Sequence, residues 1–170
     1  MRVLLLALVL SFVFTPSFNC GDSDFLRVVV YYGWLEDPVF SKIDFGSVDI
    51  AVLAAEHNLE SAEALRVLER LREHAEVYFY LAVCCGENSY TLAVDKEAWF
   101  DFVTSRIEEF LRFGDGVFLD CVSLVDPEGR RVDELFPVYV EKIIDFVHSR
   151  GGKVIVNNLI DVYDWVLELG

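Results

Sequence analysis

Residues 96–120 read KEAWFDFVTSRIEEFLRFGDGVFLD and join a helical pattern to a strand pattern. In residues 96–113, apolar side chains recur every three or four positions, as on one face of a helix: Trp99, Phe102, Val103, Ile107, Phe110 and Leu111. Gly114 follows, and glycine is a frequent helix terminator. Residues 116–120 are a short apolar run, typical of a strand buried on both faces of a parallel sheet. The stretch therefore predicts a helix followed by a parallel strand.

Strand patterns recur on both sides of this stretch. Four more apolar, β-branched runs predict strands at residues 27–32, 49–54, 77–83 and 153–157. The five predicted strands begin at residues 27, 49, 77, 116 and 153, so the repeat is 22 to 39 residues long. An eight-fold (β/α) barrel uses roughly 31 residues per unit, which this repeat fits.

Helical patterns occupy most of the intervals between these strands. Residues 61–74 place Leu65, Leu68 and Leu71 on one face. Residues 133–150 carry another apolar face, and residues 159–169 predict a further helix. Alternating strands and helices indicate a parallel sheet with crossover connections. We expect a parallel α/β fold, a partial or truncated TIM-like (β/α) barrel with about five strands, and a doubly wound sheet is the alternative.

Residues 1–20 predict a secretory signal peptide, which leaves residues 21–170 as the mature domain. Arg2 supplies a positive start, and residues 3–14 are apolar except for Ser11. This run is too short for a membrane-spanning helix, which needs about 20 apolar residues. We therefore expect a secreted or cell-surface protein without a stable membrane span. A lipid anchor at Cys20 is the alternative, although the residues before it form a poor lipobox.

Charge and cysteine content narrow the classes of partner. The formal net charge is −15, which would repel a nucleic acid. The chain has four cysteines, three histidines and no C-x-x-C pattern, so we expect neither a metal site nor another cofactor. Outside the cell, Cys121 could pair with either Cys84 or Cys85, since all three follow predicted strands.

The carboxyl ends of the predicted strands carry the candidate catalytic residues. Both parallel architectures place their functional sites at this edge of the sheet. Asp120 directly follows the apolar residues 117–119, and a charge at the end of a buried strand needs a partner or a function. Glu56 is the other carboxylate at a strand end. We predict Asp120 and Glu56 as catalytic residues.

Candidate substrate-binding residues lie at the same strand ends. Tyr32 and Trp34 have aromatic faces with polar tips, which suit stacking on a sugar ring. Because side chains alternate along a strand, Tyr31 and Tyr32 should point to opposite faces. Asn157 has an amide that can donate to and accept from a sugar hydroxyl or a carboxylate.

Two motifs resemble one known family. The sequence DGVFLD at residues 115–120, followed by GGKVIVN at residues 151–157, resembles the spherulin-4-like and endo-α-1,4-polygalactosaminidase group, glycoside hydrolase family 114. The resemblance covers residues 27–158. It implies a TIM-like barrel, export, and hydrolysis of a galactosamine-containing polysaccharide, with Asp120 as the strand-four catalytic Asp and Asn157 as the strand-five Asn.

The chain departs from this family at two points. Cys121 stands where many relatives have an acidic residue, and the family's second catalytic carboxylate lies beyond strand five. Glycoside hydrolysis ordinarily uses two carboxyl groups about 5–9.5 Å apart, and Glu56 is the candidate for the second one. A partner chain that completes the barrel is a further expectation.

Three functional hypotheses follow from the sequence. The first is an exported glycoside hydrolase, and the second is a catalytically silent protein that binds polysaccharide. The third is a doubly wound domain for a small ligand, although the sequence contains neither a glycine-rich phosphate loop nor a G-x-S-x-G elbow.

Overall fold

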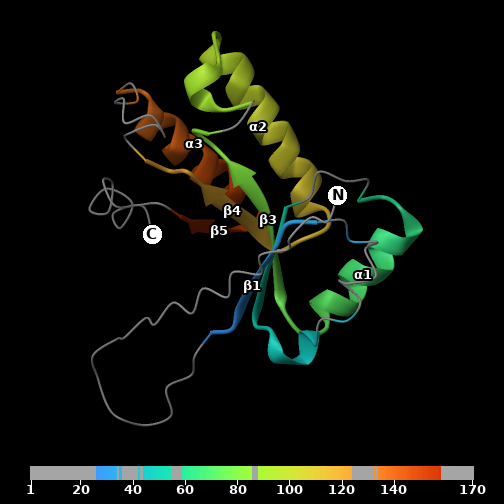
Figure 1. Ribbon diagram of the computed structural model, residues 1–170. Coiled ribbons are helices and arrows are strands. Elements are labelled where there is room, and N and C mark those ends of the chain that lie inside the picture. Colours follow the sequence, from blue (N-terminus) through green and yellow to red (C-terminus); the bar gives the residue numbers. More distant parts are fainter. Residues whose placement is uncertain are drawn as a thin grey trace, which may run out of the picture. The chain divides into compact units, whose positions relative to one another are not determined.

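Five parallel strands form one sheet in sequential order, β1-β2-β3-β4-β5 (Figure 1). The structure, a computed structural model, describes residues 26–33, 35, 42, 44–54, 59–85, 88–123, 132 and 134–157. The strands are β1 (Val28–Tyr31), β2 (Ile50–Leu53), β3 (Glu76–Ala82), β4 (Gly116–Asp120) and β5 (Lys153–Val156). The prediction of a parallel α/β fold with about five strands is confirmed.

The chain divides into two compact units within β3, the first ending at Tyr78 and the second beginning at Phe79. The predicted signal peptide lies outside the described residues, as does the helix expected at residues 159–169. Within the part of the chain that is described, no helix combines the length and apolar character needed to cross a membrane.

In the first unit, β1 and β2 pair in parallel from Val28 opposite Ile50 to Tyr31 opposite Leu53. Side chains alternate at the end of β1 as expected, because Tyr31 is buried and Tyr32 is 58% exposed. Gly33 lies against the Tyr31 ring, where an added Cβ would come within 2.7 Å of the phenol oxygen. A glycine at this position therefore allows the ring to fold back over the chain.

Helix α1 (Ala62–Arg72) begins at Ser61, whose hydroxyl accepts a hydrogen bond from the Ala64 N–H. Leu68 and Leu71 are buried as predicted. The prediction for Leu65 is wrong, because this side chain is 37% exposed and Ala64 is buried instead. The buried stripe of the helix therefore begins at Ala64 instead of Leu65 and continues through Leu68 and Leu71.

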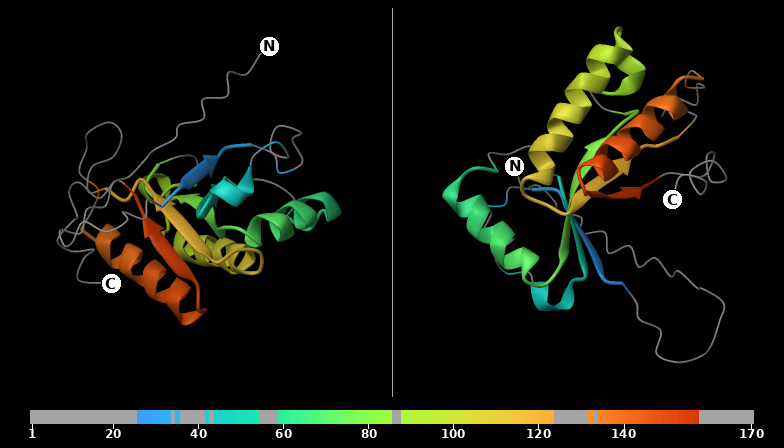
Figure 2. Two further views of the ribbon diagram at one scale, coloured as in Figure 1. Left: turned by 90° about the horizontal axis from the view of Figure 1, so that it is seen from below. Right: turned by 180° about the vertical axis from the view of Figure 1, so that it is seen from behind.

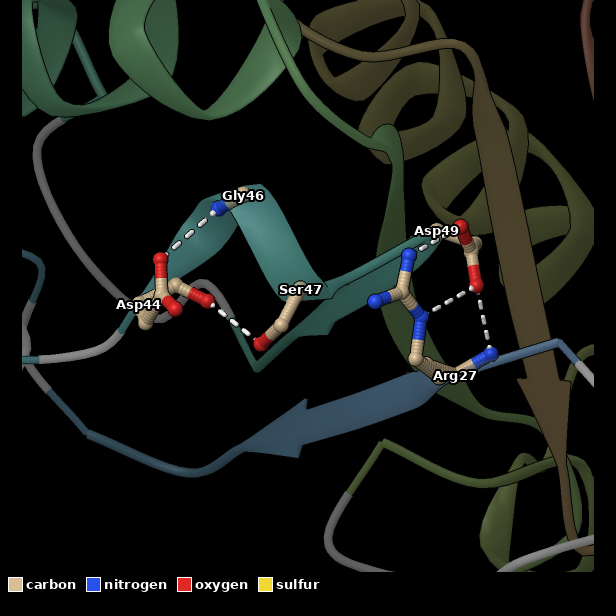
Figure 3. A network of polar contacts seen from close by, with 5 residues as sticks. All are labelled: Arg27, Asp44, Gly46, Ser47 and Asp49. Carbon is tan, nitrogen blue, oxygen red and sulfur yellow. Dashed lines mark hydrogen bonds and ion pairs between the residues drawn. The ribbon is translucent and has the colours of Figure 1, made fainter.

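An ion pair joins the beginnings of β1 and β2 (Figure 3). The Asp49 carboxylate accepts hydrogen bonds from the Arg27 backbone N–H at 2.7 Å and from its guanidinium at 3.0 and 3.1 Å. Nearby, Asp44 accepts from the Gly46 N–H and starts the short 3-10 helix η2 (Phe45–Ser47). These contacts hold the amino end of the β1–β2 pair.

The Arg27–Asp49 pair predicts a pH-dependent contribution to stability. The Arg27 side chain, and then its backbone N–H, holds the pKa of Asp49 below its ordinary value. Because the folded-state pKa is the lower one, the contribution is present above about pH 4 and is lost as the pH falls through the folded-state value. We expect Asp49→Asn to lower the urea midpoint near pH 7, and the gap to wild type to narrow as the pH falls from about 4 through the folded-state pKa of Asp49. A gap that stays constant over this range would contradict the assignment.

In the second unit, α2 (Lys96–Leu111) and α3 (Phe136–Ser149) lie side by side and pack against β4 and β5 (Figures 1 and 2). The Asp95 carboxylate caps α2 by accepting from the N–H groups of Glu97 and Ala98. The α2 side chains that face the core are Trp99, Val103, Ile107 and Phe110. The prediction for Phe102 is wrong, because this side chain is 44% exposed.

One local feature of the second unit differs from the sequence prediction, and another was not predicted. Helix α3 begins at Phe136 rather than at residue 133, with Pro137 in its first turn. Proline lacks an N–H group and is well tolerated only there. The loop after β3 forms a short 3-10 helix, η3 (Tyr90–Leu92), whose Tyr90 ring is buried against Trp99, Phe136 and Tyr139.

Candidate functional site

Asp120 is the last residue of β4, and both of its carboxylate oxygens accept hydrogen bonds. The Tyr80 hydroxyl, from β3, donates to Oδ2 at 2.6 Å. The Asn157 side-chain amide, directly after β5, donates to Oδ1 at 2.8 Å. All three side chains are half-buried. Three neighbouring strands thus contribute one polar side chain each to a cluster at the end of β4.

The strand register explains why these side chains meet. In the β4–β5 pair, Phe118 lies opposite Ile155 and Leu119 opposite Val156, so the next pair along the ladder is Asp120 with Asn157. The Asn157 backbone N–H donates to the Leu119 carbonyl at 2.8 Å and extends the ladder to this point. The carboxylate and the amide are therefore neighbours because of backbone pairing.

The cluster lies on the sheet face that α2 and α3 leave uncovered. Phe79 stacks on Phe110 of α2, with ring centroids 5.0 Å apart, so it marks the face beneath the helices. Side chains alternate along a strand, and Tyr80 therefore points to the other face, where its ring stacks on Phe118 at 6.1 Å. Asp120 is two residues after Phe118 and shares this face. In a parallel (β/α) barrel, the face away from the helices is the interior.

This arrangement suits carboxylate chemistry. An ionised carboxylate is a pure acceptor, and here both donors fix its orientation. A carboxylate held in one orientation can transfer a proton, attack a sugar carbon or accept from a sugar hydroxyl. Among the described residues, no group of three or more His, Cys, Asp and Glu side chains is placed to hold a metal ion.

A disulfide lies directly beside Asp120. Cys121, the next residue, is bonded to Cys85, which follows β3, and the two Cα atoms are 6.1 Å apart. Cys84 is buried and stands outside this disulfide, and its thiol donates a hydrogen bond to the Cys121 carbonyl oxygen. Of the two pairings left open by the sequence, the structure therefore contains the one with Cys85.

Three further residues were predicted for the site: Tyr32, Trp34 and Glu56. Tyr32 follows β1 in the first unit and is exposed there. Trp34 and Glu56 lie outside the described residues. Their roles as substrate-binding residue and second carboxylate stay predictions.

Tyr80 is the site residue that the sequence reasoning missed. It lies inside the predicted strand at residues 77–83, where an aromatic side chain is ordinary core material. The available signal was its hydroxyl group, which lies on the strand that precedes the Asp120 strand. A search for side chains with hydroxyl groups on the strands neighbouring Asp120 would have found it.

Comparisons with known proteins give one structural similarity. The sequence matches no protein-family model, and no curated protein matches it significantly. The fold is similar to a structure described as "Crystal structure of C-terminal domain of putative chitinase from Desulfitobacterium hafniense DCB-2", with a TM-score of 0.54 and 11% sequence identity. The similarity covers 77% of this chain and 45% of that chain, so the present chain corresponds to less than half of the domain it resembles.

Proposed function

We propose that the chain is an exported glycoside hydrolase-like protein that acts on a galactosamine-containing polysaccharide. The observation that carries the proposal is Asp120, which stands at the carboxyl end of β4 with both oxygens fixed by Tyr80 and Asn157. In this proposal Asp120 serves as acid, base or nucleophile, and Glu56 is the second carboxylate. Tyr32, Trp34 and Asn157 contact the sugar.

The strand order supports a piece of a (β/α) barrel. Sequential order is that of a barrel, whereas a doubly wound sheet reverses its order at a switch point, as in 2-1-3-4-5. The fold similarity to the Desulfitobacterium hafniense domain is in line with a carbohydrate-active protein, since that domain is described as part of a "putative chitinase". The ligand-binding alternative on a doubly wound sheet is therefore not retained.

Two features support export. The first is the leader-like pattern in residues 1–20, and the second is the Cys85–Cys121 disulfide. Disulfides persist in oxidising compartments and are rare in the cytosol. We propose a secreted or cell-surface location.

A silent carbohydrate-binding protein is the second candidate. Hydrolysis needs two carboxyl groups, and the cluster of Tyr80, Asp120 and Asn157 contains one. The same three side chains could hold a sugar hydroxyl without turnover. The test must therefore measure binding and hydrolysis separately.

The test uses two cationic polymers, α-1,4-linked galactosaminan and β-1,4-linked glucosamine polymer, incubated with the full-length protein after export from a host cell. We expect new reducing ends from the galactosaminan only. The glucosamine polymer is the control, because it is also cationic and reveals binding to the acidic protein through charge alone. Binding of galactosaminan without new reducing ends would contradict the hydrolase proposal and support the silent carbohydrate-binding protein. Absence of both binding and hydrolysis would overturn the proposal.

A further inference from the structure

Cys121 has an unusual backbone conformation directly after Asp120. Its φ is 59°, and among the described residues it is the non-glycine residue with a positive φ. Residues other than glycine are disfavoured in this left-handed region, and they keep such a conformation only where the surroundings impose it. The conformation of Cys121 sets the direction of the chain as it leaves Asp120.

The surroundings of Cys121 are themselves firmly held. The disulfide joins it to Cys85, which follows β3. Before Cys85, the Val83 carbonyl accepts from the Tyr90 N–H at 2.8 Å, and the Cys84 carbonyl accepts from the Thr91 hydroxyl at 3.0 Å. Val83 and Cys84, directly before Cys85, are therefore bonded to residues 90 and 91, and Tyr90 is buried in the aromatic core.

Backbone contacts connect these residues to the site. The Val83 N–H donates to the Asp120 carbonyl at 3.0 Å, and the Val122 N–H donates to the Asn157 carbonyl at 3.2 Å. Residues 120–122 are thus tied to β3 on one side and to Asn157 on the other. A change of φ at Cys121 would act on both ties, one of which is accepted by the Asp120 main-chain carbonyl and the other by that of Asn157.

We propose that Cys85 and Cys121 are positioning residues for Asp120. Their disulfide holds Cys121 in the left-handed conformation, and this keeps the Asp120 carboxylate between the Tyr80 hydroxyl and the Asn157 amide. The effect on sugar chemistry rests on the proposed function, whereas the effect on the geometry of Asp120 does not.

The test compares two variants that both lack the disulfide. In Cys85→Ser with Cys121→Ser, the residue after Asp120 still disfavours a positive φ. In Cys85→Ser with Cys121→Gly, glycine adopts the left-handed conformation without steric cost. The readout is the side-chain amide resonance of Asn157 in a ¹H–¹⁵N spectrum of the full-length protein, because this amide donates to Asp120.

We expect the serine pair to shift the Asn157 resonance and the glycine variant to retain its wild-type position. If galactosaminan is hydrolysed, kcat of the serine pair should fall by up to about a hundredfold with little change in KM, since small misplacements of a catalytic group cost this much. The glycine variant should recover most of that loss. If the disulfide served stability alone, the Cys121→Gly substitution would not restore the lost kcat.

Two outcomes overturn the inference: an unchanged Asn157 resonance in the serine pair, or equal shifts in both variants. If the serine pair does not fold, the wild type is reduced with a water-soluble phosphine and the same resonance is followed. The phosphine takes up oxygen from water and supplies two electrons, so the disulfide becomes two thiols. A wild type that hydrolyses no polymer would defeat the proposed function, while the resonance would still decide this inference.

Discussion

Asp120→Asn is expected to lower hydrolysis of galactosaminan by about a thousandfold or more, because general acid–base catalysis by a positioned group contributes 10²–10⁴-fold. The new amide keeps the shape of the carboxylate. Its oxygen can accept from the Asn157 amide, and its NH₂ group can donate to the Tyr80 hydroxyl, which also accepts. The substitution therefore removes the proton or nucleophile chemistry proposed for Asp120 and leaves the hydrogen-bonded frame in place.

The control for this prediction is Asp115→Asn, which removes one negative charge just before the amino end of the same strand. Its hydrolysis rate should stay close to wild type, because parallel α/β folds place their functional sites at the carboxyl ends of the strands. The measurement is the initial rate of reducing-end release for each variant, with circular dichroism as the check on folding. Equal rates for Asp120→Asn and wild type would remove Asp120 from the mechanism.

Phe110→Ala is expected to lower the free energy of unfolding by about 3–5 kcal/mol, the usual cost of truncating a buried aromatic side chain. Phe110 is 2% exposed and stacks on Phe79, and the Arg106 guanidinium lies over its ring at 4.9 Å. Truncation would remove the apolar contacts and leave a cavity between α2 and the sheet. Urea denaturation followed by tryptophan fluorescence measures the change, since Trp99 lies on the same helix.

Phe102→Ala is the matched control, with the same residue type on the same helix. Its side chain is 44% exposed, so its loss should cost no more than about 1 kcal/mol. A similar loss of stability in both variants would mean that the burial of Phe110 is not what holds α2 on the sheet.

Elements with a strong local signal could be predicted from the sequence. Residues 116–120 have the predicted bounds, because an apolar run ends there at a charged residue and begins at a glycine. The predicted start of α3 at residue 133 is three residues too early, because Pro137 marks the first turn of the helix. Phe102 shows the limit of periodicity: an apolar stripe can be wider than the face that a helix buries.

The sequence predicts only those site residues that can be recognised within one strand, without knowing how the strands align. Asp120 and Asn157 stand at strand ends in the sequence, so their candidacy needed no knowledge of pairing. Tyr80 and the choice of Cys85 over Cys84 depend on how β3 aligns with β4. A shift by one residue would turn the opposite set of side chains toward Asp120, and no sequence feature fixes that alignment.

The sequential strand order also bears on how the chain can assemble. Each strand pairs with the strand that precedes it along the chain, so no pairing in the described sheet waits for a segment made much later. The chain segment between one strand and the next is short, so the entropic cost of closing the loop between them is small. The sheet can therefore grow vectorially, one strand and one helix at a time, as the chain is synthesised from its amino end. On this path the Asp120 carboxylate gains its Tyr80 partner when β4 docks and its Asn157 partner when β5 follows.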